Sequence, residues 1–266
     1  MTTHRSLASS FRILGIDRRL PVIAHASLSA FGPLQGGAEA LLDALLSAWD
    51  SLVMPTFTYK TMLVPEVGPE GNAMAYGSGA DHNRLAELFT PSLPADRLMG
   101  ILPEMLRKHP DARRSTHPIL SFAGVRADLA LDAQTLAEPL APIRVLAESG
   151  GWVLLLGVNH TANTSIHLAE RLAGRMTFIR WALTREGVKE CPGFPSCSDG
   201  FQALAPRVAW ITRKIQVGQA LVQALPLPEL IEITRSTIEE NPYALLCQRD
   251  YCPRCQAVRA KLAGLS

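Results

Sequence analysis

The sequence predicts an α/β protein built on a mainly parallel central sheet with helices on both faces. Short apolar segments that suit buried strands occur at 20–27, 51–56 and 152–158. Between the first two segments, apolar residues recur at the spacing of one helix face: Leu41, Leu42, Leu45, Leu46 and Trp49. A strand, a helix and a second strand in this order form a βαβ unit, which favours a parallel sheet covered by helices.

The remaining elements follow from the same kind of pattern. Residues 57–99 have no sustained period, so we predict a long and functional loop with a short helix at 85–89. Beyond it we predict further helices at 101–109, 142–148, 201–205 and 228–240, and further strands at 121–125 and 176–183. Asn163 or Thr164 can cap a helix that begins at Ser165 and ends at Gly174. No repeat or low-complexity linker divides the chain, so we expect a single domain over 1–266.

Composition narrows the classes of protein. The 266 residues include 26 basic and 24 acidic side chains, for a formal charge of +2, which excludes a strongly basic nucleic-acid-binding protein. No apolar run reaches the roughly 18 residues that span a bilayer, and the N-terminus lacks the apolar core of a signal peptide. We therefore expect a cytoplasmic protein with no membrane partner and no nucleic-acid partner.

His167 and Glu170 are the first candidate catalytic residues. They stand three positions apart on a predicted helix, so their side chains share a face. A carboxylate beside an imidazole can orient the ring for general-base catalysis, although a surface pair with a small effect on stability has the same spacing. His25 ends the first predicted strand, where ligands of open α/β sheets bind, but a buried structural histidine also fits that position.

Two oppositely charged segments could bind charged ligands. Between residues 107 and 115, Arg107, Lys108, Arg113, Arg114 and Ser115 offer cations and a hydroxyl that suit phosphate oxygens. The 57–99 segment has five acidic and three basic residues, hence a net charge of −2. This division fits an anionic and a cationic ligand that meet between the segments, and equally two solvated surfaces.

The cysteines indicate a metal site. Cys252 and Cys255 form a CxxC knuckle, and Cys191 and Cys197 could complete a tetrahedral zinc site. In a cytoplasmic protein, bound metal is more plausible than a structural disulfide, while free buried thiols remain an alternative. A thioredoxin-like role is disfavoured because this CxxC does not follow the first strand of a βαβ unit.

Several segments occur in an order typical of one enzyme family. They are 25–28, Gly36-Gly37, 52–56, 99–107, 114–121 and 154–170, and the most specific are RSTHP at 114–118 and NTSIHLAE at 163–170. On these segments the chain resembles the aminoglycoside 3-N-acetyltransferase family, which has the antibiotic N-acetyltransferase fold. The resemblance covers about 10–185 and leaves the cysteine-bearing C-terminal part, about 186–266, outside it.

The resemblance implies an acetyl-CoA-dependent N-acetyltransferase, typical of antibiotic resistance. It would transfer an acetyl group directly to an amine of an aminoglycoside or a related amino compound. His167 would accept the proton of the attacking amine, Glu170 would hold the imidazole, and His25 would position the reacting groups. The resemblance places the pantetheine arm of CoA along Ser27, Leu28 and Thr56, and the phosphates of CoA near Arg114, Ser115 and Ser121.

The acceptor, the oligomeric state and one competing function stay open at this point. Antibiotic-modifying family members carry a richly acidic pocket for a polycationic sugar, whereas 57–99 here is only mildly acidic. A homo-oligomer is compatible with the sequence. The competing hypothesis is a non-catalytic zinc-containing binding protein whose C-terminal cysteine cluster engages a partner.

Overall fold

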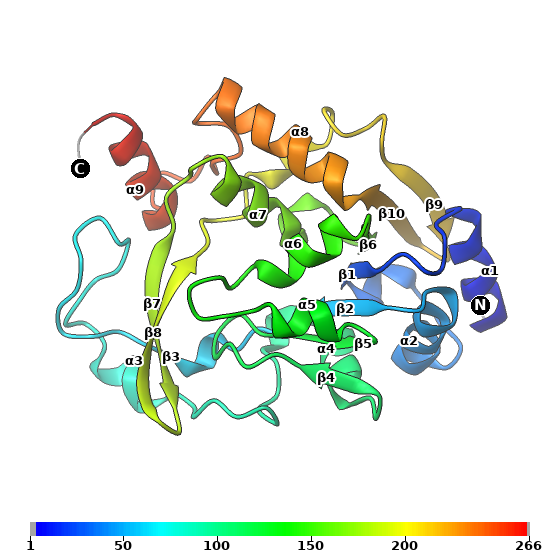
Figure 1. The fold of residues 1–266 in the computed structure, drawn as a ribbon, viewed down its shortest axis with the longest axis horizontal. Helices are drawn as coiled ribbons and strands as arrows, with labels where there is room; N and C mark the ends of the chain where they lie inside the picture. The colour runs from blue at the N-terminus through cyan, green and yellow to red at the C-terminus, as the bar shows by residue number, and fades with distance from the viewer. Residues whose placement is uncertain (1–3, 265–266) are drawn as a thin grey trace.

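A seven-stranded sheet forms the centre of the molecule in the computed structural model, which describes residues 4–264 (Figure 1). The strands are β1 Val22–Ala26, β2 Leu52–Pro55, β4 Ala112–Arg114, β5 Phe122–Val125, β6 Trp152–Leu156, β9 Arg213–Val217 and β10 Ala220–Pro226. Their order across the sheet is β4-β5-β2-β1-β6-β10-β9. The α/β class predicted from the sequence is confirmed.

The parallel part of the sheet is smaller than predicted. Strand β1 runs parallel to β2 and to β6, while the pairs β2–β5, β4–β5, β6–β10 and β9–β10 are antiparallel. Parallel neighbours need a crossover of a dozen or more residues. The segments 115–121 and 218–219 are too short for one, so β4 with β5 and β9 with β10 pair antiparallel. The expectation of a mainly parallel sheet was therefore wrong outside its three central strands.

Helices cover both faces of the sheet, as predicted. One face packs against α1 His4–Ile13, α2 Gly37–Ala48 and α4 Ile101–Lys108. The other packs against α5 Asp128–Asp132, α6 Ala141–Glu148, α7 Ser165–Leu172 and α8 Leu227–Glu240 (Figure 1). Alternation along each strand explains the two cores, because Val22 and Ala24 of β1 face one set of helices and Ile23 faces the other.

The 57–99 segment contains more structure than predicted. Its helix is α3 Ala80–Arg84, and the helix expected at 85–89 is absent from the described residues. Oδ1 of Asn83 accepts a hydrogen bond from the backbone N–H of Val64, and Nδ2 of Asn83 donates one to the Val64 carbonyl, both at 2.8 Å. These two bonds hold Asn83 against Val64, and the helix lies before residue 85 rather than after it. The short strand β3 Met62–Leu63 joins β7 Phe178–Thr184 and β8 Gly187–Phe194 in a second, antiparallel sheet.

The C-terminal part ends in α9 Pro253–Leu262, which lies at the same end of the molecule as β7 (Figure 1). This helix, α1 and the β9–β10 hairpin have no counterpart among the predicted elements. Among the described residues, no helix combines the length and the apolar character needed to cross a bilayer.

Candidate active site

A cavity of about 300 Å³ lies where the three parallel strands end. His25 at the end of β1, Pro55 at the end of β2 and Val158 just after β6 line it. Parallel strands bring their carboxyl ends to one edge, which is where open α/β sheets bind ligands. The sequence predicted this edge as the site, and the cavity lies there.

His167 and Glu170 form a buried pair on α7 at this cavity. Nδ1 of His167 lies 2.7 Å from Oε2 of Glu170, and the two side chains are 9% and 5% exposed. The His167 ring also packs edge-on against Phe201, with ring centroids 4.7 Å apart. His167 lines the cavity. The alternative of a solvated surface pair is therefore wrong.

Glu170 is held by two further residues. Nη1 of Arg175 lies 2.6 Å from Oε1, and Oγ of Ser196 lies 2.8 and 2.7 Å from the two carboxylate oxygens. Burial by itself would raise the pKa of Glu170, but the hydrogen bond and charge of His167, the charge of Arg175 and the hydrogen bond from Ser196 together lower it. Glu170 is therefore an ionised carboxylate that accepts a hydrogen bond from the N–H at His167 Nδ1.

The first turn of α7 is fixed by Asn163. Its Oδ1 accepts a hydrogen bond from the backbone N–H of Ser165 at 3.2 Å, while Thr164 occupies the cap position without a side-chain bond. Of the two caps that the sequence allowed, Asn163 makes the bond. His167 consequently lies in the first turn, at the end of the helix that faces the cavity.

His25, on β1, also lines this cavity. Its Nε2 is buried and has no hydrogen-bond partner among the described residues. Burial lowers the pKa of His25 to about 3, so the ring is neutral at physiological pH. The structure thus brings His25 and His167 together, as expected from the strand and helix that carry them.

Thr56, Ser121 and Arg114 contact one another but do not line the cavity. Oγ of Ser121 donates to Thr56 O at 2.9 Å and accepts from Nε of Arg114 at 3.0 Å. Arg114 also donates to carbonyl oxygens of Thr56, Leu93 and Pro91 and lies over the Phe89 ring. Their hydrogen-bonding groups serve the protein's own backbone here, and the expected contact with CoA stays a prediction.

The other residues expected at CoA have separate surroundings. Ser115 exchanges hydrogen bonds with the backbone of Phe122, at 2.8 and 3.3 Å. Ser27 and Leu28 directly follow β1, where Oγ of Ser27 lies 3.1 Å from Oγ of Ser29. These three residues also lie outside the lining of the cavity, and their contact with CoA stays a prediction.

The basic segment is largely neutralised by the protein itself. Arg107 pairs with Glu104 at 2.7 Å, and Arg113 pairs with Asp132 at 2.7 Å and with Asp128. Arg107 and Arg113, two of the cations expected to bind an anionic ligand, are therefore already paired with acidic side chains of the protein.

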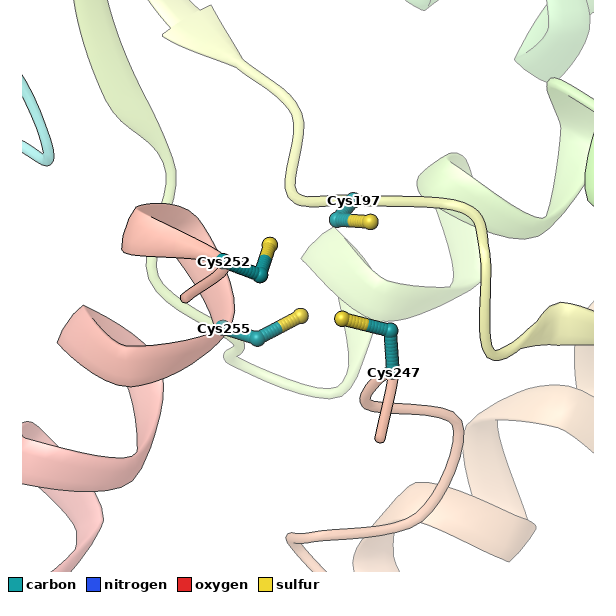
Figure 2. A group of neighbouring side chains, drawn as sticks. All are labelled: Cys197, Cys247, Cys252 and Cys255. Atoms are coloured by element: carbon teal, nitrogen blue, oxygen red, sulfur yellow. The ribbon is translucent and has the colours of Figure 1, made fainter. Parts of the chain in front are cut away.

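Four cysteines converge beside the active site, and they differ from the predicted set by one member. The Sγ atoms of Cys197, Cys247, Cys252 and Cys255 all lie within 4.8 Å of one another, and all four residues are buried. Figure 2 shows Cys252 and Cys255 at the start of α9, Cys247 after α8 and Cys197 after β8 gathered in one place, with the sulfurs of Cys247 and Cys255 pointing toward each other. Four thiolates in this arrangement suit a tetrahedral zinc ion.

The assignment of Cys191 to this site was wrong. Cys191 belongs to β8, where its Sγ lies 3.8 Å from the Lys189 carbonyl, and it is not part of the converging group. Burial, followed by the charge of Glu190, raises the pKa of the Cys191 thiol to about 12. The strand carries this side chain away from the group, and Cys247, five residues before Cys252, takes its place.

Sequence reasoning missed three residues of the site, namely Arg175, Ser196 and Arg254. Arg175 follows Gly174, just beyond the end of α7. Ser196 directly precedes Cys197, and Arg254 lies between Cys252 and Cys255. Nη1 of Arg254 donates to Ser196 O at 2.9 Å, and both residues line the cavity. For Ser196 and Arg254, the adjoining cysteines were the signal that could have pointed to them, whereas Arg175 had no such signal.

Comparison with known proteins decides the family. The profile of the aminoglycoside 3-N-acetyltransferases matches residues 23–239. The chain belongs to this family. A relative from Salmonella sp, aminoglycoside N(3)-acetyltransferase III, is 31% identical over 249 residues, which cover 77% of this chain and 79% of the relative.

Solved structures share the family fold. The crystal structure of aminoglycoside acetyltransferase AAC(3)-IVa superposes with a TM-score of 0.79 at 23% identity, over 97% of both chains. AAC-IIIb in a binary complex with CoASH superposes with a TM-score of 0.73 at 22% identity, over 90% of this chain and 96% of the other. Family membership confirms the enzyme class expected from the sequence, an acetyl-CoA-dependent N-acetyltransferase.

Proposed function

We propose that this family member transfers the acetyl group of acetyl-CoA to an amine of an aminoglycoside or a related amino compound, with His167 as general base. The observation that carries the proposal is the 2.7 Å contact between His167 Nδ1 and Glu170 Oε2 at the wall of the cavity. Relatives named as aminoglycoside N(3)-acetyltransferases and the CoA complex of AAC-IIIb support the substrate pair.

The hydrogen bond to Glu170 determines which nitrogen of His167 can act. With its proton on Nδ1 and donated to the carboxylate, the neutral ring keeps a free electron pair on Nε2. Nε2 accepts a proton from the amine, directly or through water, as the amine nitrogen attacks the thioester carbonyl. The new C–N bond forms, the C–S bond breaks, and the CoA thiolate leaves and is protonated. No covalent enzyme intermediate is needed.

His25 has a positioning role in this scheme. Its neutral ring lines the cavity and its buried Nε2 has no partner among the described residues, so we propose that the ring helps to position a bound reactant.

The proposed CoA site has two parts. The pantetheine arm would lie along Ser27, Leu28 and Thr56, and the phosphates of CoA would lie near Arg114, Ser115 and Ser121.

A cytoplasmic location and a homo-oligomeric state remain predictions.

We further propose that Cys197, Cys247, Cys252 and Cys255 bind a structural zinc ion. The donor set fits, because four buried cysteine sulfurs lie within 4.8 Å of one another and zinc takes four thiolate ligands in structural sites. The ion would tie the segment after β8 to the start of α9. Because the four thiols are buried, they support the alternative of a partner-binding cluster poorly.

Thiol release during incubation with acetyl-CoA and a panel of amines tests the acetyl transfer. We expect CoA to appear in step with the acetylated amine, and only when an amine is present. Absence of release with every amine, together with no binding of CoA in calorimetry, would overturn the proposal.

A further inference from the structure

Arg254 provides a positive charge at the wall of the cavity that holds His167. It lies between Cys252 and Cys255 at the start of α9. Its Nη1 donates to the carbonyl oxygens of Pro195 and Ser196, at 3.2 and 2.9 Å, which fixes the guanidinium. Within the described residues, Nε and Nη2 make no hydrogen bond and neither is buried without a partner. That edge of the guanidinium is the one that binds carboxylates and phosphates with two parallel bonds.

No carboxylate offsets this charge within the cavity. Among the described residues that line it there is no Asp and no Glu, and Arg254 has no ion-pair partner in the described part of the chain. Glu170 lies behind Ser196 and is already shared between His167 and Arg175.

A second cation, Arg180, lies near Arg254 against the same Phe194 ring, outside the lining of the cavity. The guanidinium of Arg180 lies 5.0 Å from the centre of the Phe194 ring, and that of Arg254 lies 5.7 Å from the same centre. Arg180 is buried, and its hydrogen bonds go to backbone carbonyl oxygens, so no acid among the described residues pairs with its charge. A polycationic acceptor therefore meets like charge here, whereas an anionic group meets a preformed site.

We propose that Arg254 binds an anionic group, a carboxylate or a phosphate, carried by the amine acceptor. The acceptor is then an amino compound with an anionic substituent rather than a polycationic aminoglycoside. This inference rests on the proposed acetyl transfer and narrows its substrate class.

The size of the cavity assigns the anion to the acceptor rather than to CoA. Arg254 and His167 share one cavity of about 300 Å³, at the small end of ligand sites. The thioester must reach His167, and the long pantetheine arm keeps the phosphates of CoA far from its sulfur. An anionic group on a compact amine can reach Arg254 while its nitrogen reaches His167.

Matched acceptors test the proposal. The pairs are glucosamine 6-phosphate with glucosamine, and 4-aminobutyrate with its amide, and kanamycin serves as the polycation. With the wild-type protein we expect kcat/KM to be at least tenfold higher for the anionic member of a pair. Arg254→Ala should abolish that preference by lowering kcat/KM for the anionic member about 10- to 100-fold, the usual range for a lost charge-assisted hydrogen bond.

Three further variants keep the test independent of folding. Arg254→Lys should retain part of the preference, and Arg254→Glu should raise kcat/KM for kanamycin above the wild-type value, a gain that misfolding cannot produce. The control is Arg144→Ala, which replaces an arginine of α6 that pairs with Glu148, and it should keep the wild-type preference for the anionic acceptor.

The outcomes separate the two proposals. CoA release that favours the uncharged amines or kanamycin in the wild-type protein would overturn the role of Arg254 and leave acetyl transfer intact. If Arg254→Ala lowered only the affinity for CoA, and lowered the affinity for dephospho-CoA less, Arg254 would bind a phosphate of CoA rather than the acceptor. That outcome would also overturn the proposed role of Arg254. No release with any acceptor would instead overturn the acetyl transfer.

Discussion

Ser196 donates its hydroxyl to the carboxylate of Glu170, with Oγ 2.8 Å from Oε1 and 2.7 Å from Oε2. Ser196 precedes Cys197, a member of the cysteine cluster, and Glu170 holds the proposed general base. The hydroxyl thus joins the cysteine-bearing segment to the catalytic pair. The C-terminal part that lay outside the family resemblance contributes directly to the site.

Ser196→Ala tests this connection. Removing the donor leaves a buried carboxylate short of one hydrogen bond, which costs about 1–3 kcal/mol of folding stability. We expect kcat to fall about tenfold with little change in KM, because His167 is held less firmly while the cavity keeps its shape. Urea unfolding and steady-state kinetics measure the two effects. Ser196→Thr should restore kcat, and the exposed Ser149→Ala serves as the control.

His167→Ala should abolish turnover and spare CoA binding. A lost general base lowers kcat by roughly 100- to 10,000-fold. Calorimetry with CoA should give the wild-type affinity, since the ring is proposed to contact the amine. His82→Ala, an exposed histidine of α3, should behave like the wild type. Full activity of His167→Ala would contradict the assigned role.

Stability should fall as the pH drops from about 6.5. Burial lowers the pKa of His25 to about 3; burial, then the charge of Lys214, lowers that of His160 to about 4. Burial, opposed by a backbone hydrogen bond, lowers the pKa of His117 to about 4. The unfolded chain binds these protons near pH 6.5, so the folded state loses stability between that pH and about 4.

The depressed pKa of Glu170 extends this trend to lower pH. Its contribution to stability is present above its ordinary pKa of 4.5 and is lost as the pH falls through the lower folded value. Urea unfolding at pH 7, 6, 5 and 4 measures the histidine part of the profile, and further points below pH 4 measure the Glu170 part. His117→Asn, whose amide oxygen can accept the bonds from Ile119 and Leu120, should flatten the upper part. An unfolding free energy that does not change between pH 7 and 4 would contradict the histidine assignments, and one that does not change below pH 4 would contradict that of Glu170.

Zinc content should be about one ion per chain in protein purified without chelator. Cys247→Ser removes one of four ligands and should lower both the bound zinc and the midpoint of thermal unfolding. Cys191→Ser is the matched control, because Cys191 is equally buried but lies outside the cluster, and it should retain the metal. Elemental analysis with thermal unfolding decides the matter, and zinc-free wild-type protein of unchanged stability would rule out the ion.

The sequence alone determined the features that depend on local spacing. The apolar runs placed β1, β2 and β6, and the three-residue spacing placed His167 and Glu170 on one helical face. The shared direction of the three strands then placed His25 near the same edge. Motif order was sufficient for the family, which the comparisons confirm.

Only the tertiary structure decided which distant residues meet. Cys247 replaces Cys191 in the cluster because strand β8 and the turn after α8 set their directions, and spacing along the chain carries no such information. In the same way, Arg175, Ser196 and Arg254 reach the site from beyond the end of α7, from the segment after β8 and from α9. Catalytic spacing within one helix is a local property, whereas the charge and shape of the cavity arise from packing between segments far apart in sequence.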